Sequence, residues 1–241
     1  MRKLIPPKLF TAKLSKIKKL TDDVTVFTFE HEANAFEFYP GQFVMVEFMG
    51  GEQGGKKIQR AYSIASAPHS TQFELCVKII PGGLATQYLA SLQVGDEATF
   101  KGGFGMCTIN EDAQNELLFV ATGTGLAPVK AIVDDLINKS DNRLMTILFG
   151  VRHEDDIFWQ DYFESLATKY ENIKFLLTLS QPADNWTGLT GRVTDHLAKY
   201  DFARPDLELY LCGSGAMIKS VREIALAGGM TKERLHIENF G

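Results

Sequence analysis

The stretch Leu117-Leu118-Phe119-Val120-Ala121-Thr122-Gly123-Thr124-Gly125-Leu126-Ala127-Pro128 decides the fold of the second half of the chain. Its first part, Leu117–Ala121, is a continuous apolar run of the kind found in strands that are buried on both faces. Pro128 stands where the first residue of a helix belongs. Apolar residues then recur at the spacing of one helical face: Val129, Ile132, Val133, Leu136 and Ile137. The stretch therefore predicts a buried strand, a glycine turn and a helix.

The same alternation continues to the end of the chain. Apolar runs predict further strands at Leu144–Phe149, Ile173–Leu179, Leu207–Cys212 and Leu235–Glu238. Helices are predicted at Trp159–Tyr170, Val193–Lys199 and Ala216–Leu226. Such alternation is typical of a doubly wound parallel α/β sheet with helices on both faces.

The first half of the chain has the period of antiparallel strands. Strands are predicted at Asp23–Glu30, Gly41–Phe48, Gln72–Ile80 and Ala98–Lys101, and one helix at Leu84–Leu92. Within Gln72–Ile80, alternation directs Phe73, Leu75, Val77 and Ile79 inward and Gln72, Glu74, Cys76 and Lys78 outward. Short strands punctuated by Gly and Pro predict a small antiparallel β-barrel. The polar stretch Thr108–Glu116 marks the boundary between domains of residues 1–110 and 111–241.

A basic run precedes these strands and consists of Lys13, Lys16, Lys18 and Lys19. We expect it to form a solvated edge strand, where lysine resists pairing with other chains. The alternative is a docking patch for an acidic protein partner.

Composition limits the class of protein. The chain has 241 residues, of which 45% are hydrophobic, so it can bury the cores of two small domains. Its net charge of −5 argues against a general nucleic-acid binder. Cys76, Cys107 and Cys212 form no C-x-x-C pair, so no metal site is predicted, and their scatter fits a reducing compartment. The sequence has neither a signal-peptide pattern nor a run of about 18 apolar residues, so we expect a cytoplasmic protein without a membrane segment. We also expect a monomer.

Three short motifs carry chemistry. In Arg60-Ala61-Tyr62-Ser63, an arginine fork can grip a phosphate and an aromatic ring can lie on a large conjugated ring. In an extended segment Arg60 and Tyr62 point to one face, and Ala61 and Ser63 to the other. The turn Ala121–Pro128 can offer free N–H groups to a phosphate, although Pro128 replaces the third glycine of the G-x-G-x-x-G pattern and a plain strand–helix turn is the alternative.

The third motif, Cys212-Gly213-Ser214-Gly215, follows a predicted strand of the same sheet. Ligands bind at the carboxyl ends of such strands, near the point where the strand order reverses. Cys212 is then either a thiol that faces a reacting centre or a small buried hydrophobic residue.

Five ordered motifs give the chain a family resemblance over nearly its whole length. They are Arg60-x-Tyr62-Ser63, Gly82-Gly83-Leu84-Ala85-Thr86, Gly123-Thr124-Gly125-Leu126-Ala127-Pro128, Cys212-Gly213-Ser214-Gly215-Ala216-Met217 and Glu238-Asn239-Phe240. The chain resembles the ferredoxin–NADP reductase superfamily. It looks most like the reductase components of bacterial oxygenase systems and the stand-alone bacterial ferredoxin or flavodoxin reductases. The resemblance implies a flavin-binding β-barrel followed by a nicotinamide-binding α/β domain.

The resemblance also implies roles in binding the flavin. Arg60 would hold the phosphates, and Ala61, Tyr62 and Ser63 would lie along the isoalloxazine ring. Backbone N–H groups would wrap the pyrophosphate, with a hydroxyl from the last residue of the set Gly83, Leu84, Ala85 and Thr86. The strand residues Cys76, Val77 and Lys78 would border the ribityl or adenosine part.

On the nicotinamide side, the resemblance places Thr122 beside both cofactors. Gly123, Thr124 and Gly125 would take the dinucleotide phosphates, and Gly213 and Met217 would complete the site. Cys212 would lie near the carbon that gives up hydride, and Glu238 and Phe240 near the ring. The implied catalytic residues are Cys212, Thr122, Ser63 and Glu238.

The implied activity passes hydride from NADH or NADPH to FAD, and electrons onward to a separate ferredoxin, flavodoxin or oxygenase-type acceptor. FAD is favoured over FMN, because the family members that use FMN usually carry an attached iron–sulfur domain. NADH is favoured because Leu179–Asp184 holds a carboxylate and no cation for a ribose phosphate, although Arg192 could compensate. The alternative is a reductase of free flavin. A regulatory module without turnover is disfavoured, since every motif is intact.

Overall fold

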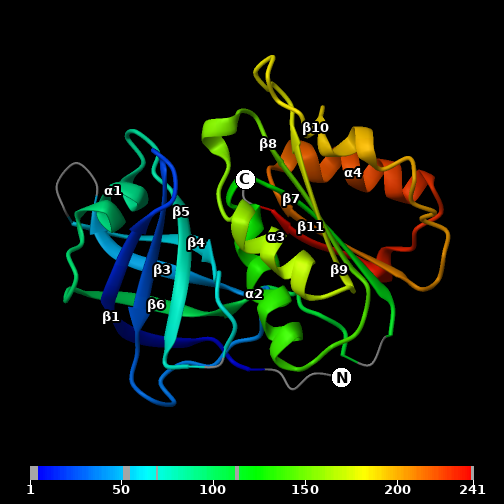
Figure 1. Ribbon diagram of the computed structural model, residues 1–241. Coiled ribbons are helices and arrows are strands. Elements are labelled where there is room, and N and C mark those ends of the chain that lie inside the picture. Colours follow the sequence, from blue (N-terminus) through cyan, green and yellow to red (C-terminus); the bar gives the residue numbers. More distant parts are fainter. Residues whose placement is uncertain (1–4, 51–54, 69, 112–113, 240–241) are drawn as a thin grey trace.

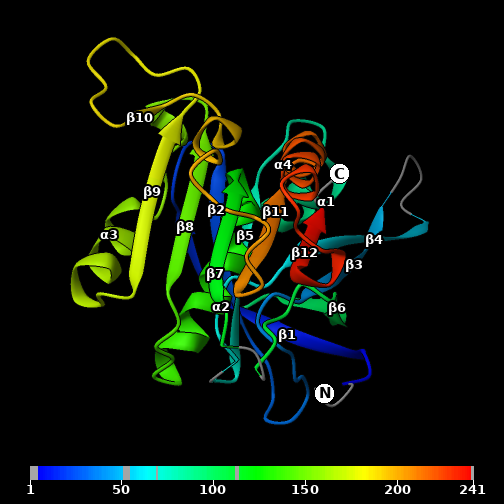
Figure 2. The same cartoon turned by 90° about the vertical axis from the view of Figure 1, so that its right-hand side faces the viewer.

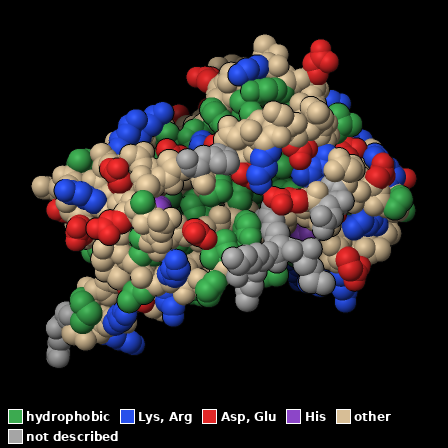
Figure 3. Space-filling view, turned by 90° about the horizontal axis from the view of Figure 1, so that it is seen from below, with side chains coloured by type: hydrophobic (Ala, Val, Ile, Leu, Met, Phe, Trp, Pro, Cys, Tyr) green, Lys and Arg blue, Asp and Glu red, His purple; other side chains and the backbone are tan. Residues whose placement is uncertain are grey.

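The structure is a computed structural model, which describes residues 5–50, 55–68, 70–111 and 114–239. An antiparallel β domain and an α/β domain lie side by side (Figure 1). Both sheets match the fold class that the sequence predicts. On one face of the molecule, acidic and basic side chains are interspersed over both domains (Figure 3). Within the described residues, no helix has the length and apolarity needed to span a membrane.

The N-terminal domain is a six-stranded antiparallel sheet with the order β4-β3-β6-β1-β2-β5. Its strands are β1 (Lys8–Lys19), β2 (Val24–Glu30), β3 (Phe43–Gly50), β4 (Lys56–Ser63), β5 (Gln72–Lys78) and β6 (Glu97–Phe104). The sheet curls so that a bridge between Ile64 and Leu75 joins the end of β4 to β5. Helix α1 (Leu84–Ser91) packs through Tyr88 on Phe48 of β3, with ring centroids 4.8 Å apart.

Phenylalanines fill the core of this barrel. Phe29 and Phe73 stack with ring centroids 5.6 Å apart, and Phe100 meets Phe73 edge-on at 5.1 Å. All three are fully buried. Burial of each ring contributes about 1.5–3 kcal/mol, so this cluster holds the antiparallel strands together without a metal or disulfide among the described residues.

The C-terminal domain is a parallel sheet with the order β10-β9-β8-β7-β11-β12. Its strands are β7 (Glu116–Thr122), β8 (Met145–Val151), β9 (Ile173–Leu179), β10 (Leu189–Thr190), β11 (Leu207–Gly213) and β12 (Leu235–Asn239). The chain runs outward from β7 to β10 and then returns to add β11 on the other side of β7. The strand order therefore reverses between β7 and β11, which is where such sheets bind ligands.

Helices cover both faces of the parallel sheet (Figure 2). Helices α2 (Leu126–Asn138) and α3 (Gln160–Lys169) pack on one face, against residues such as Phe119. Helix α4 (Gly215–Ala227) packs on the other, against residues such as Val120. Alternate residues of β7 thus enter different cores, which explains why the whole strand is apolar.

The two domains share a core. Val24, Val26, Ala65 and Cys76 of the barrel belong to the same buried cluster as α2. At its edge, Lys130 of α2 donates to the Ala65 carbonyl at 3.2 Å and pairs with Asp134 at 3.0 Å.

Several sequence-based expectations require correction. Strands β1 and β4 are longer than any predicted there, and the short helix predicted at Val193–Lys199 is a 3₁₀ helix at Val193–His196. Cys76 does point away from the barrel core, but it is buried against the second domain and not exposed. The expectation that the basic run forms an edge strand is also wrong, because the strand that contains it, β1, lies between β6 and β2. Its basic part, Lys16–Lys19, has β2 as its registered partner.

Candidate functional site

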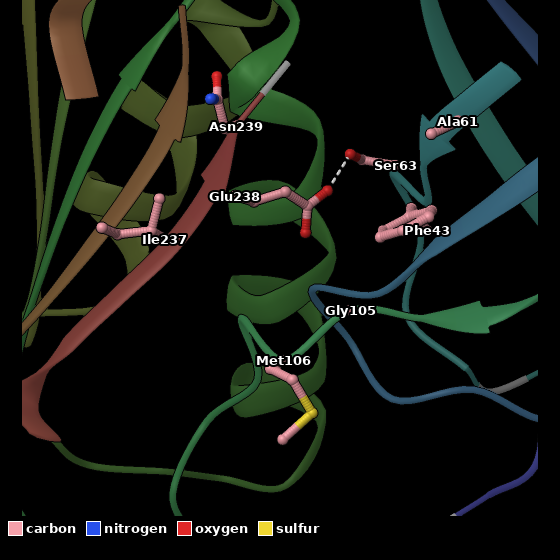
Figure 4. A pocket seen from close by; sticks show the side chains of 8 residues that line it. All are labelled: Phe43, Ala61, Ser63, Gly105, Met106, Ile237, Glu238 and Asn239. Atoms are coloured by element: carbon pink, nitrogen blue, oxygen red, sulfur yellow. Dashed lines mark hydrogen bonds between the residues drawn. The ribbon is translucent and has the colours of Figure 1, made fainter. Parts of the chain in front are cut away.

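The ends of β4 and β12 bring Ser63 and Glu238 together across the domain boundary. The Ser63 hydroxyl donates a hydrogen bond to Oε1 of Glu238 (Figure 4). The two side chains are only 5% and 7% exposed. Within the described residues, Oε2 of Glu238 has no hydrogen-bond partner. Because an unpaired buried carboxylate oxygen is costly, this atom marks a place prepared for a ligand or a proton.

Burial raises the pKa of Glu238 to about 7, and the Ser63 hydrogen bond opposes this rise. Removal from water disfavours the charged carboxylate, whereas a donated hydrogen bond favours it. Glu238 can therefore hold or release a proton near neutral pH, as a group in proton transfer must.

A pocket of ≈ 180 Å³ opens beside this pair (Figure 4). Its lining combines both domains and the segment between them: Phe43, Ala61, Ser63, Gly105, Met106, Ile237, Glu238 and Asn239. Strand alternation puts Ala61 and Ser63 on the pocket side of β4. The sequence analysis missed Phe43, Gly105, Met106, Ile237 and Asn239. The glycines of Gly102-Gly103-Phe104-Gly105 were the available signal, and Gly105 does have a positive φ of 103°.

Arg60 and Tyr62 occupy the opposite face of β4. Arg60 is exposed, and its Nη1 donates to the Gln59 carbonyl at 2.8 Å. Tyr62 is half-buried against the barrel core, and burial raises its pKa to about 12 despite the nearby Arg60 charge. The predicted division of the motif between two faces is therefore observed. A ligand that contacts all four residues has to pass around the end of this strand.

The turn Gly82–Thr86 leads into α1. Gly82 has a φ of +76°, which favours glycine, and no side chain caps the helix at Gly83. The N–H groups of the first helical turn suit a phosphate for that reason. The Thr86 hydroxyl accepts from the Ile80 N–H at 3.2 Å and lies 3.0 Å from the Gly83 carbonyl. It closes the turn, so in this structure it is not directed at a ligand as the resemblance implies.

The three predicted residues of β5 differ in exposure. Cys76 and Val77 are buried in two different cores, because β5 packs on both faces. Lys78 is exposed and pairs with Asp23 at 2.7 Å. Of the three side chains, that of Lys78 is the one available to a ligand. Phe240 lies outside the described residues.

Two glycine turns meet at the point where the strand order reverses. A Cβ at Gly125 would lie 2.1 Å from the Cys212 carbonyl oxygen, and one at Gly213 would lie 2.4 Å from Oγ1 of Thr122. Gly213 also has a φ of +142°. Glycine is required at both places for the turns to pack. The predicted residues Thr122, Gly123, Thr124, Gly125 and Gly213 are thus brought together.

The two helices that leave these turns begin differently. Helix α2 follows Gly125 without a side-chain cap, so its N-terminus suits an anionic group. Helix α4 is capped by Ser214, whose Oγ accepts from the Met217 N–H at 3.4 Å. The Met217 side chain is buried against the sheet.

Cys212 lies next to Glu238 in the β11–β12 register, but its thiol is fully buried. Its Sγ is 3.8 Å from Sγ of Cys107. The hydrogen bond with Cys107 and burial raise the pKa of Cys212 well above that of an ordinary thiol. The structure therefore supports the second sequence-based alternative, a small buried residue, and the role of the thiol at a reacting centre stays a prediction.

The segment after β9 adjoins the loop after β8. Gln181 donates its N–H to the Arg152 carbonyl at 2.9 Å, and its own carbonyl lies 2.8 Å from Nδ1 of His153. The Ala183 N–H donates to Glu154 at 2.9 Å. The Glu154 carboxylate and the backbone of Arg152 therefore adjoin this segment, and no local sequence pattern indicated this contact.

These features fit a flavin and a dinucleotide. An exposed guanidinium and an uncapped helix N-terminus suit phosphates, and a pocket with an unpartnered buried oxygen suits the polar edge of a ring. A second uncapped helix begins at the switch point of the parallel sheet.

Comparisons with known proteins agree with this geometry. The profile described as "Oxidoreductase FAD-binding domain" matches residues 11–109, and that described as "Oxidoreductase NAD-binding domain" matches residues 119–223. Ferredoxin--NADP reductase B of Sorangium cellulosum is 32% identical over 98% of this chain and 100% of its own length. The toluate 1,2-dioxygenase electron transfer component of Pseudomonas putida is 27% identical over 96% of this chain and 67% of its own length.

Among solved structures, a cytochrome P450 reductase of Amycolatopsis superposes with a TM-score of 0.87 at 25% identity, over 99% of this chain and 72% of that one. The chain belongs to the ferredoxin–NADP reductase superfamily. It is an NAD(P)H-dependent flavoprotein oxidoreductase with an FAD-binding and a nicotinamide-binding domain.

Proposed function

We propose that this protein takes hydride from NADH onto FAD and passes the electrons to a separate ferredoxin, flavodoxin or oxygenase-type protein. The contact between Ser63 and Glu238 carries the proposal, because it joins the barrel to the last strand of the parallel sheet at a buried, partly unsatisfied carboxylate. The functional division falls at residues 110 and 111, between β6 and β7.

The predicted residues that remain available divide between the two cofactors. Arg60 and the first turn of α1 would hold the flavin phosphates, and Tyr62 and Ser63 would contact the ring. Gly123–Gly125 would bind the dinucleotide phosphates. FAD, when bound, accepts the hydride and returns electrons one or two at a time. FMN would leave the α1 turn with less to bind, so FAD is favoured.

Ser63, Glu238 and Cys212 form the reactive side of the site. Ser63 orients the Glu238 carboxyl by its hydrogen bond. Glu238 exchanges a proton near neutral pH because burial has raised its pKa to about 7. Thr122 accepts from the Ser214 N–H at 3.4 Å and so fixes the two turns relative to each other. This arrangement would orient a bound nicotinamide relative to the flavin, and orientation would be the main contribution of the protein.

The preference for NADH rests on charge beside Gln181. A ribose phosphate placed there would meet the carboxylates of Asp184 and Glu154, with Arg152 as the neighbouring cation. Arg192 follows β10, and its N–H is bonded to Asp195 at 2.8 Å.

The names of the relatives support an onward protein acceptor. One is a ferredoxin reductase, and another is the electron transfer component of a dioxygenase. This chain spans two thirds of the dioxygenase component, so the acceptor is proposed from chemistry shared by both names.

Anaerobic reduction tests the proposal. We expect the purified protein to contain FAD, to lose its yellow colour with stoichiometric NADH, and to regain it when oxidised ferredoxin or flavodoxin is added. A colourless protein that oxidises NADH only when flavin is supplied would favour the alternative, a reductase of free flavin. A colourless protein that is inert in both assays would refute the two enzyme functions together.

A further inference from the structure

Two thiols from different parts of the chain lie in contact behind the site. Sγ of Cys107 and Sγ of Cys212 are 3.8 Å apart. Both cysteines are free, and they are 1% and 0% exposed. Cys107 belongs to the segment that joins the domains, and Cys212 to β11. A bond between these sulfurs would therefore connect two elements that are separate in the covalent chain.

The backbones on both sides are firmly held. A Cβ at Gly41 would lie 2.0 Å from the Cys107 carbonyl oxygen, and one at Gly125 would lie 2.1 Å from that of Cys212. Such close packing leaves side-chain rotation as the motion by which the sulfurs approach. The required approach is about 1.8 Å, since a disulfide bond is about 2.05 Å long.

Each of the two cysteines adjoins a residue that lines the pocket. Met106, which precedes Cys107, is 86% exposed and lines the pocket. Glu238, the registered neighbour of Cys212 on β12, lines the opposite side (Figure 4). A small neutral oxidant in the pocket is thus one residue from each cysteine, whereas glutathione is too large to reach the buried sulfurs.

We propose that Cys107 and Cys212 are a redox-modification site, which hydrogen peroxide converts into a disulfide. One sulfur attacks a peroxide oxygen, the O–O bond breaks, and the thiol proton leaves in the first water. The second sulfur attacks the resulting sulfenic acid, the S–S bond forms, and the S–O bond breaks to release the second water. Two thiols lose two electrons in total, and one peroxide becomes two waters.

The bridge changes the site without removing the flavin. It ties the interdomain segment to β11 beside Gly213 and occupies the Cys212 sulfur. The contacts assigned to the flavin phosphates, at Arg60 and α1, belong to the barrel and remain. The expected slowing of flavin reduction rests on the proposed function, but formation of the bridge does not.

Thiol counting and mass spectrometry test the bridge directly. We expect peroxide to lower the thiols of the unfolded protein from three to one, with a Cys107–Cys212 linked peptide that dithiothreitol cleaves. The Cys76→Ala variant should fall from two thiols to none, with the same linked peptide. The Cys107→Ser variant should form no intramolecular link, although its untreated NADH oxidation should equal that of the wild type.

These readouts separate the inference from the proposed function. If the linked peptide forms in a protein that never oxidises NADH, the modification site stands and the proposed function fails. If NADH is oxidised but peroxide produces no link in the Cys76→Ala variant, the modification site is refuted. Equal thiol loss in wild type and Cys107→Ser would refute it as well, because it would indicate independent oxidation of single cysteines.

Discussion

The two ends of the parallel sheet treat their polar groups in opposite ways. At the amino ends of β7, β8 and β11, buried charges are paired. At the carboxyl ends, glycine turns meet, helix α2 begins without a side-chain cap, and Oε2 of Glu238 has no partner within the described residues. Buried polar groups that have hydrogen-bond partners stabilise a fold, whereas buried polar groups without partners remain able to bind a ligand. The contrast supports the proposal that the carboxyl ends bind the ligands and the amino ends stabilise the sheet.

Arg143 illustrates the amino end. Its guanidinium is 5% exposed and contacts Asp141, with Nη2 to Oδ2 at 2.7 Å. Its Nη1 also donates to the Asn110 carbonyl at 3.0 Å. This ion pair therefore ties the loop before β8 to the segment between the domains.

Strand β12 shows both behaviours within three residues. His236 pairs with Glu208 and stacks on Tyr210 with ring centroids 4.3 Å apart. Burial raises the pKa of Glu208, but the interactions with His236, the hydrogen bond from Asn115 and the charge of Arg143 together outweigh it, so the net pKa lies below the usual range. Two residues later, Glu238 has the opposite shift. The paired end of β12 anchors the strand that carries the unpaired carboxyl.

Replacing Arg143 should give the largest loss of stability. Arg143→Ala leaves Asp141 without its buried partner, and we expect unfolding free energy to fall by about 3–4 kcal/mol. FAD content per folded molecule should stay unchanged, since Arg143 lies at the end away from the site. Urea unfolding measures the first effect and absorbance the second. Arg204→Ala is the matched control, because its 41% exposed side chain should cost at most about 1 kcal/mol. Similar losses in both variants would contradict the contrast.

Glu238 should behave in the opposite way. Its pKa rises from a usual value near 4.5 to about 7 in the folded protein, so the folded state binds the proton more tightly. Without cofactor, stability should therefore fall as pH rises from 4.5 to 7, by about 2–3 kcal/mol. Glu238→Gln removes the titrating group and should flatten this slope.

Unfolding at several pH values, on cofactor-free protein, measures the effect. Glu223→Gln on the exposed face of α4 is the control and should keep the wild-type slope. If the dependence of unfolding free energy on pH is unchanged in Glu238→Gln, the Glu238 carboxyl does not titrate with a raised pKa. The main evidence for a contrast between the two ends of the sheet would then be lost.

The sequence was sufficient wherever a local pattern determines the outcome. Ile173–Leu179 was predicted with its observed bounds, because five of its seven residues form an apolar run that is typical of a strand in a parallel sheet. Strand β1 was not predicted as an internal strand, because the prediction was based on its lysines alone. Phe10, Ala12 and Leu14 alternate into the core and are the signal of a half-buried strand. Strand β1 is long and pairs with both β2 and β6, and this pairing depends on how the whole barrel closes.

The site divides in the same way. Arg60, Ser63 and the glycine turns belong to motifs that are continuous in sequence, so they could be named in advance. Met106 and Ile237 line the pocket because distant segments converge there, and no local pattern records that. The contact between Cys107 and Cys212, 105 residues apart, likewise exists only in the folded chain.

Arg60 tests the ligand-binding side without affecting the core. Arg60→Ala removes an exposed cation and should weaken FAD binding by about 1.5–3 kcal/mol, or roughly 10- to 100-fold, through loss of a charge-assisted phosphate contact. Thermal unfolding of the cofactor-free protein should not change. Lys56→Ala, on the same strand, is the control and should retain FAD.

Cys212→Ala should keep FAD but slow its reduction by NADH, so identical behaviour of the Arg60→Ala and Cys212→Ala variants would contradict their division of roles.

The smallest effect is expected at the margin of the ligand-binding end, after β9. Asp184→Arg replaces a carboxylate with a cation beside the proposed ribose position, and exposed charges interact by on the order of 1 kcal/mol. The ratio of kcat/KM for NADPH to that for NADH should therefore rise several-fold, and the rise should shrink at high ionic strength. Glu171→Arg, exposed at the opposite end of β9, makes the same charge change and should leave the ratio unaltered. If both variants shift the ratio equally, net charge controls the preference and Asp184 does not. If neither shifts it, the second ribose lies elsewhere, and Arg152 and Arg192 become the cations to replace.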